Sequence, residues 1–285
     1  MSLNIDIRSK SQINIIYQIN ARILLIVGSI IFLLPLFWML STSLKLHEQI
    51  FVRPPIWVPH PIMWRNYLDA LTFIPFFSYL KNTVYVCTLS VIGTLLSNSL
   101  VAYGFSRIKW PGRDIMFMLV LATLMIPYQV IMIPLFVIFK NLGWVNSFRP
   151  LWIPTFFGNA FFIFLLRQFF LTIPLELSEV AKIDGASDFC IYLRIILPLA
   201  KPVLAVVALF EFLGSWKDFL GPLIYINDSN KYTLSLGLQQ FQTQHGGEWA
   251  LLMSAATMMI APIIILFFFT QKTFIQGITL TGLKE

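Results

Sequence analysis

The chain contains few charged residues and few cysteines. Only 12% of its 285 residues are charged, whereas 58% are hydrophobic and the mean hydropathy is +0.78. Soluble domains carry about twice as many charges, so this composition excludes one and predicts a single polytopic membrane domain. The two cysteines, Cys87 and Cys190, provide neither a disulfide framework nor a metal site.

The sequence also lacks the motifs of a nucleotide-hydrolysing or metal-dependent enzyme. It contains no G-x4-G-K-[ST] segment and no run of glycines that would bind phosphate. The three histidines, His47, His60 and His245, are isolated from one another. We therefore expect a non-catalytic protein with no catalytic residue, cofactor or metal of its own.

Long apolar segments dominate the chain instead. Each is about 18 residues or longer, the length that an α-helix needs to cross a bilayer. They lie at 23–40, 82–105, 115–139, 151–171, 203–226 and 249–269. The first run is long enough to span and lacks a small-residue cleavage site, so no cleavable signal peptide is expected. The runs predict an all-α membrane protein with about six transmembrane helices, the third interrupted by Pro127 and Pro134.

Residues 174–202 form the only long charged interval between two strongly apolar segments. They predict two short helices joined at Gly185, the residue type that most easily turns a chain at a helix C-terminus. Glu176 and Glu179 fall near the positive end of the first helix dipole, and Ser187 is placed to cap the second helix. Each helix has about ten residues, roughly 15 Å, which is too short to cross a bilayer. The pattern predicts a docking element on the membrane surface.

The same interval resembles the EAA signature of membrane subunits of bacterial ABC importers, EAA-x3-G-x9-I-x-L-P. The segments EVAKIDGAS and RIILPLAKP are similar to the carbohydrate-uptake branch, specifically its shorter, maltose- and oligosaccharide-type permease. Val180 stands where the signature has its first alanine, and its bulk is expected to alter packing against a partner. The resemblance implies a helix-turn-helix ATPase-docking loop between spans four and five, with the residues Glu179, Val180, Ala181, Asp184, Gly185, Ile195, Leu197 and Pro198.

The resemblance also implies an organisation and a set of partners. A cytoplasmic tail (1–22) precedes one permease domain (23–270), which contains the coupling loop 172–202, and a cytoplasmic tail (271–285) follows. That tail matches the family's ending at Gln271, Phe274, Gly277 and Thr279. The implied partners are a second, non-identical permease, two ATPase subunits that bind ATP and Mg²⁺, and an extracytoplasmic sugar-binding protein. The net charge of +7 then reflects positive-inside orientation in a bacterial inner membrane rather than nucleic-acid binding.

A second group of candidate residues lies in the fifth apolar run. A carboxylate such as Glu211 costs about 2.5 kcal/mol or more at the bilayer centre, so it should face the bundle or a water-filled path. Asp218 follows two helical turns later. This region resembles the sugar permeases, in which a Trp-Asn-Asp-Phe cluster is usual, although Lys217 replaces the asparagine. The candidate pathway residues are Glu211, Trp216, Asp218 and Phe219, and a helix-packing cluster is the alternative interpretation.

The sequence therefore predicts a permease subunit of an ATP-driven importer for a mono-, di- or oligosaccharide or a derivative. Two alternatives remain open at this point. One keeps the ABC assignment but changes the cargo to another small solute. The other is a proton-coupled carrier that works alone, with Glu211 as its proton site.

Overall fold

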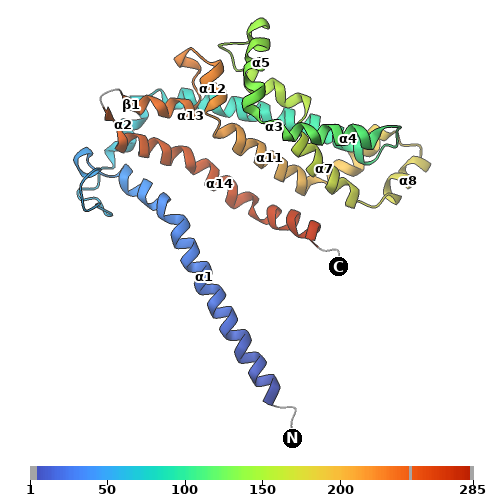
Figure 1. Ribbon diagram of the computed structural model, residues 1–285, viewed down its shortest axis with the longest axis horizontal. Coiled ribbons are helices and arrows are strands. Elements are labelled where there is room, and N and C mark those ends of the chain that lie inside the picture. The colour runs from blue at the N-terminus through green and yellow to red at the C-terminus, as the bar shows by residue number, and fades with distance from the viewer. Residues whose placement is uncertain (1–4, 244–245, 283–285) are drawn as a thin grey trace. The chain divides into compact units, whose positions relative to one another are not determined.

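The computed structural model describes residues 5–243 and 246–282, which form two compact units (Figure 1). Unit 1 comprises Met1–Phe73 and Phe241–Met258, and unit 2 comprises Ile74–Gln240 and Met259–Glu285. Apart from two strands of two residues each, the described elements are helices, which confirms the predicted all-α class. His245 and the ends of both predicted tails, residues 1–4 and 283–285, lie outside the described residues.

Unit 1 is built around the C-terminal end of its first helix. Its elements are α1 (Ile5–Ser43), η1 (His47–Gln49), α2 (Arg65–Phe73), the antiparallel pair β1 (Gln242–Thr243) and β2 (Gly246–Gly247), and the start of α14 (Trp249–Gly282). Asn66 on α2 donates two hydrogen bonds of 2.9 Å, to the carbonyls of Ser43 and Lys45. Ser254 on α14 donates to the same Ser43 carbonyl at 3.1 Å. The proline-rich connection after α1 is therefore held by side chains rather than by a long helix.

Unit 2 contains more helices, many of them short. They are α3 (Phe76–Ser106), α4 (Arg113–Ala122), η2 (Thr123–Met125), α5 (Tyr128–Asn141), α6 (Arg149–Trp152), η3 (Ile153–Phe157), α7 (Ala160–Thr172), α8 (Glu176–Ile183), α9 (Asp188–Ile191), the π-helical η4 (Tyr192–Ile196), α10 (Leu197–Leu199), α11 (Lys201–Trp216), α12 (Leu220–Tyr225), η5 (Ser229–Lys231), α13 (Leu234–Gly237) and η6 (Leu238–Phe241). The long helix α3 packs against α7, α11 and η3.

The core of unit 2 lies along α3. Ala102 and Tyr103 of α3 pack with Leu166 and Phe170 of α7 and with Val207 of α11. Helices approach this closely only where small residues face the neighbour. A side chain at Gly93 of α3 would meet the ring of Phe156 and the hydroxyl of Thr155, both in η3. Gly93 is therefore the contact point that admits the irregular segment η3, as its position in a span full of small residues predicts.

The described residues contain four helical segments that are long and apolar enough to cross a membrane, and two bent helix pairs that pass the same test when each pair is taken together. The four are Tyr17–Ser43, Phe76–Ser106, Arg149–Thr172 and Trp249–Gln271, and the pairs are Arg113–Met125 with Tyr128–Asn141, bent by 97°, and Asp188–Leu199 with Lys201–Trp216, bent by 80°. Counting each pair once gives six spans, as predicted. The bends agree with the expectation that neighbouring protein groups can replace lost helical hydrogen bonds inside a membrane.

Several predicted boundaries were wrong. The fifth run was expected to be helical from 203 to 226, but α11 ends at Trp216 and α12 begins at Leu220, because Asp218 caps a new helix there. In the third run only Pro127 breaks the helix, since Pro134 lies inside α5. Helices α1 and α14 run on beyond the predicted apolar runs 23–40 and 249–269, and the assignment of 1–22 and 271–285 as cytoplasmic tails stays a prediction. Helix propensity continues across polar residues, so composition alone places such ends poorly.

The close contact at Gly93 predicts a specific cost. Gly93→Ala forces the Phe156 ring to move and should destabilise unit 2 by about 1–3 kcal/mol. Gly104→Ala is the matched control on the same helix, because a methyl group there has nothing within 4 Å. Thermal unfolding in detergent measures the difference. Equal midpoints for the two variants would contradict the assigned packing.

Candidate solute cavity and docking element

A cavity of about 530 Å³ opens inside unit 2. Its lining residues come from three segments that are separate in sequence, 128–139, 150–159 and 211–225. They are Tyr128, Leu135, Phe139, Pro150, Leu151, Pro154, Thr155, Asn159, Glu211, Gly214, Ser215, Asp218, Gly221 and Tyr225. Three of them mark the places where a helix is interrupted: Tyr128 follows the first break, at Pro127, Asn159 stands at the second, between η3 and α7, and Asp218 stands at the third, between α11 and α12. Interrupted helices are the usual source of solute sites in membrane transporters, since their free backbone and polar side chains face the path.

The second interruption, between η3 and α7, is organised by two asparagines. Gly158 adopts a φ of +90°, a left-handed conformation that favours glycine. Asn159 then caps α7, since its side-chain oxygen accepts from the amide of Phe161 at 3.0 Å. The amide of Asn159 itself donates to Oδ1 of Asn98 on α3 at 2.6 Å. The buried side chain of Asn98 thus replaces a helical partner.

The third interruption, between α11 and α12, depends on Asp218. Its Oδ1 accepts from the amide of Gly221 at 3.0 Å, and its carbonyl accepts from the hydroxyl of Ser235. A Cβ atom at Gly221 would collide with the Asp218 carboxylate and crowd Leu151. Asp218 therefore has a structural role as a cap in addition to facing the cavity.

Polar and aromatic groups share the cavity wall. Glu211 lies one helical turn before Ser215, whose hydroxyl donates to Oε1 of Glu211 at 2.9 Å. Phe139 and Tyr225, which also line the cavity, make an edge-to-face contact with ring centroids 5.4 Å apart. Carboxylates accept from hydroxyl groups and aromatic faces contact C–H surfaces, so this wall suits a polyhydroxylated molecule.

The structure brings together two of the four predicted pathway residues. Glu211 and Asp218 line the cavity. Trp216 does not: it is 2% exposed, its Nε1 donates to the carbonyl of Met259 at 3.1 Å, and its ring stacks on Phe212. Phe219 is also absent from the lining. Trp216 is therefore a helix-packing residue in this structure, as the alternative interpretation of the cluster expects. Any contact of these four residues with a solute stays a prediction.

Sequence reasoning missed the cavity residues outside the fifth run. Tyr128 and Asn159 come from two different segments, and no local motif joins them. The available signal was the position of helix breakers, because Pro127 precedes Tyr128 and Gly158 precedes Asn159. Their convergence depends on the tertiary fold.

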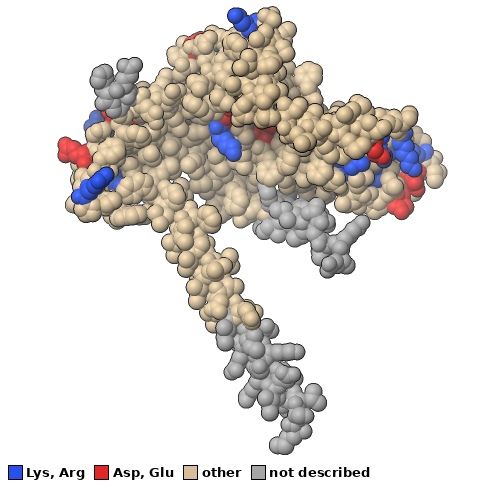
Figure 2. Space-filling view, viewed as in Figure 1, with Lys and Arg blue, Asp and Glu red and all other residues tan. Residues whose placement is uncertain are grey.

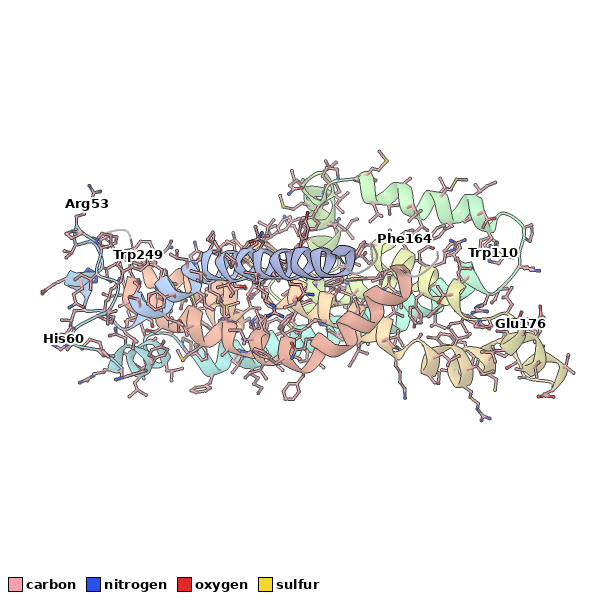
Figure 3. The ribbon with its side chains drawn as sticks, turned by 90° about the horizontal axis from the view of Figure 1, so that it is seen from below. Arg53, His60, Trp110, Phe164, Glu176 and Trp249 are labelled. Atoms are coloured by element: carbon pink, nitrogen blue, oxygen red, sulfur yellow. The ribbon has the colours of Figure 1, made fainter. Side chains whose placement is uncertain are left out.

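The docking element has the expected helix–glycine–helix geometry. Gly185 has a φ of +83° and follows α8, and the hydroxyl of Ser187 accepts from the amide of Cys190 at 3.2 Å as the predicted cap. An ion pair of 2.8 Å between Lys182 and Asp188 closes the turn. Glu176 and Trp110 lie at the same end of unit 2 (Figure 3), where charged side chains gather around α4 and α8 (Figure 2).

The two halves of the docking element differ in burial. None of the residues of α8 is buried, and its apolar side chains Leu177, Val180 and Ile183 are 44%, 58% and 85% exposed. Val180, the departure from the signature, therefore points away from this chain's own core. The second half is packed into the core through residues that include Tyr192 and Ile196.

Two long-range contacts join α3 to the buried half of the docking element and to the end of α7. The hydroxyls of Tyr192 and Ser99 are 2.7 Å apart. Arg107, just after α3, donates through Nη2 to the carbonyls of Phe170 and Ile173, both at 2.5 Å. Burial lowers the pKa of Arg107, so these carbonyls offset a desolvation cost. Arg107 thus caps the end of α7 where the docking element begins.

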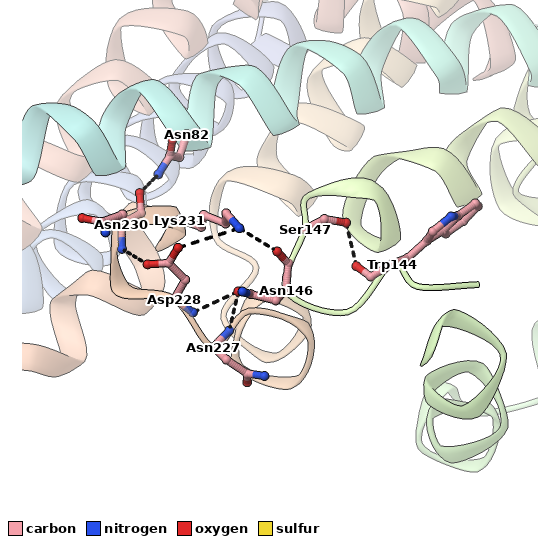
Figure 4. A network of polar contacts seen from close by, with 8 residues as sticks. All are labelled: Asn82, Trp144, Asn146, Ser147, Asn227, Asp228, Asn230 and Lys231. Carbon is pink, nitrogen blue, oxygen red and sulfur yellow. Dashed lines mark hydrogen bonds and ion pairs between the residues drawn. The ribbon is translucent and has the colours of Figure 1, made fainter. Parts of the chain in front are cut away.

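A second polar cluster joins the turn after α5 to the loop after α12 (Figure 4). Asn146 has a φ of +61° and its side-chain oxygen accepts from the amides of Asn227 and Asp228. Lys231 donates to the carbonyl of Asn146 at 3.0 Å. Asn82 of α3 donates to the carbonyl of Asn230 at 3.0 Å. The loop after α12 is thereby fastened both to α3 and to the turn after α5.

The carbonyl contacts of Arg107 predict a stabilising role. Arg107→Gln shortens the side chain and leaves the Phe170 and Ile173 carbonyls without their donor, which should cost about 1–3 kcal/mol. Arg65→Gln is the control, because the Arg65 side chain is 80% exposed and its ion pair with Asp69 contributes little. Limited proteolysis of 172–202 and thermal unfolding measure the effect. Indistinguishable stability of the two variants would exclude the capping role.

Comparison with known proteins agrees with these features. Residues 90–280 match the family described as "Binding-protein-dependent transport system inner membrane component". The chain is 31% identical to the arabinooligosaccharides transport system permease protein AraQ of Bacillus subtilis (strain 168), over 94% of this chain and 96% of that relative. It is 32% identical to the trehalose/maltose transport system permease protein MalG of Thermococcus litoralis, over 94% and 98%.

A solved structure shares the fold. The match has a TM-score of 0.79 at 24% identity and covers 90% of this chain and 96% of the other, in the crystal structure of a bacterial ABC transporter involved in the import of the acidic polysaccharide alginate. The family match spans well over half of the chain, and the relatives align almost from end to end. The chain therefore belongs to the family of binding-protein-dependent transport system inner membrane components.

Proposed function

We propose that the chain is a permease subunit of an ATP-driven sugar importer, and that α8 is the part that docks on an ATPase. The family establishes a multi-pass inner-membrane transport component that works with a binding protein. The observation that carries the proposal is the exposed apolar face of α8, held by Gly185 against a second helix that is buried in the core. An exposed apolar face on a rigid support is typical of an interaction surface.

Motion of α8 has a direct route to the cavity. The second half of the docking element, Asp188–Leu199, continues into α11 through a bend of 80° next to Pro198. Helix α11 carries Glu211 into the cavity wall. Displacement of α8 therefore moves the bend and, with it, one wall of the cavity. ATP and the loaded binding protein shift the equilibrium only by binding one of the two states more tightly.

The docking residues divide into contact and support roles. Glu179, Val180 and Asp184 on or next to α8 contact the ATPase. Ala181 packs on the core of unit 2 beneath them, together with Ile195 and Leu197 of the second half. The contact group is exposed and the supporting group is partly buried. We assign no catalytic residue to this chain, because ATP and Mg²⁺ are bound by the ATPase subunits.

The remaining partners follow from the surfaces of the chain. A second, non-identical permease completes the pathway, two ATPase subunits dock on the inner face, and an extracytoplasmic protein delivers the sugar. The charged end near α8 faces the cytoplasm, in agreement with the positive-inside rule, and both termini lie on that side. The cargo is a sugar because the cavity wall combines carboxylate, amide and aromatic groups. The sugar-transport permeases among the relatives support the same cargo class.

A charge placed on the exposed apolar face of α8 is expected to weaken binding of the ATPase. Ile183→Asp places a charge in the apolar contact and should reduce co-purification of the ATPase in mild detergent by about tenfold or more. Ile183→Val keeps the apolar character and serves as the control. If the unmodified chain co-purifies with no ATPase, the result would favour the alternative of a stand-alone, proton-coupled carrier with Glu211 as its proton site.

The turn at Gly185 predicts uncoupling without loss of insertion. A Cβ atom at Gly185 would have nothing within 4 Å, but a leucine is strained at a φ of +83°, by roughly 1–2 kcal/mol, so the two helices should change their relative orientation. Gly112→Leu is closely matched, because Gly112 has the same φ and equally open surroundings outside the docking element. Uptake and ATP hydrolysis are measured in the same proteoliposomes. We expect ATP hydrolysis without uptake for Gly185→Leu alone, whereas wild-type uptake would exclude the proposed lever.

A further inference from the structure

The cavity wall is charged with one sign only. Among its lining residues Glu211 and Asp218 are carboxylates, and none is a lysine, arginine or histidine. Among the side chains that the structure describes, those of residues 17–242 and 247–271, no basic group forms an ion pair with either carboxylate. Lys217 is next to Asp218 in sequence, but it is exposed and does not line the cavity.

The two carboxylates differ in how their charge is satisfied. Asp218 accepts from the backbone amide of Gly221 and so serves the α12 cap. Glu211 accepts from the hydroxyl of Ser215, one turn along the same helix, and lines the cavity. A charge in a recess with apolar walls attracts ions of opposite sign and repels ions of like sign, because the low dielectric of the walls concentrates its field. Glu211 is therefore the residue best placed to distinguish solutes by charge.

We infer that Glu211 makes this cavity selective against anions, so that the imported sugar is neutral or carries an amine rather than a carboxylate. The inference rests on the proposed function for its cargo class, and it adds a specificity-determining residue to that function. A uronic acid would place its carboxylate against the Glu211 and Asp218 oxygens without a compensating cation in this wall. A hydroxyl or ammonium group would instead donate a hydrogen bond to them.

The test measures the charge selectivity of the cavity without any knowledge of the cargo. A single cysteine is placed at Leu135, which lines the cavity from α5 and is separate from both carboxylates. Cys87 and Cys190 are first replaced by alanine. The full-length chain in the assembled importer then reacts with two methanethiosulfonate reagents, the cationic trimethylammonium-ethyl and the anionic sulfonatoethyl compound. A cysteine at the exposed residue Val58 corrects for intrinsic reactivity.

We expect the corrected rate ratio to favour the cationic reagent by about tenfold in the cavity. Glu211→Gln removes one of the two charges at nearly constant size and should lower the ratio several-fold, while Asp218 retains the rest of the preference. The control Lys217→Gln removes an exposed charge and should change the ratio by less than about twofold. An unchanged ratio in Glu211→Gln would overturn the inference. So would the absence of reaction with both reagents, since a cavity closed to water selects nothing.

This outcome is separable from the proposed function. The labelling ratio depends on the cavity of this chain and requires neither ATP hydrolysis nor delivery by a binding protein. If the ATPase co-purifies while the ratio is one, the charge selectivity is wrong and the importer assignment stands. If no ATPase co-purifies while the ratio favours the cation, the importer assignment is wrong and the selectivity of the cavity stands.

Discussion

Unit 2 depends on one constraint: a bilayer offers no hydrogen-bond partners, so each interrupted helix needs a partner from the protein. Helix α3 supplies many of them. Asn98 accepts from the amide of Asn159, Thr83 accepts from the amide of Leu234, and Ser97 donates to the carbonyl of Thr155. With these groups satisfied, the chain can leave the helical path inside the membrane and enclose a polar cavity instead of an apolar core.

The same helix connects the cavity to the docking element. Ser99 and Arg107 hold the buried half of that element and the end of α7, while Asn98 holds the broken span that contributes Asn159 to the cavity. These contacts define a body in which α8 projects outward and α11 leads inward through a bend of 80°. A force applied at α8 is then transmitted through packed helices, because a close-packed interior resists compression.

The fold class, the number of spans and the helix–glycine–helix geometry of the docking element were predictable, because each follows from local periodicity or from residues such as Gly185 and Ser187. The cavity was predictable only in part. Glu211 stands out as a carboxylate in an apolar run, but Trp216 looks equally functional in sequence and proves to be a core residue bonded to Met259. The local sequence does not reveal that Asn159 meets Asn98, since the two residues are joined only by tertiary packing.

Hydrogen exchange at the interruptions tests this account most directly. In the assembled importer in lipid nanodiscs, the amides of Asn159 and Leu234 should exchange as slowly as amides inside α3, because Asn98 and Thr83 satisfy them. Asn98→Ala should accelerate exchange at Asn159 by about tenfold or more and leave Leu234 unchanged. Fast exchange at both amides in the unmodified protein would contradict the account, because α3 would then not support the interrupted helices around the cavity.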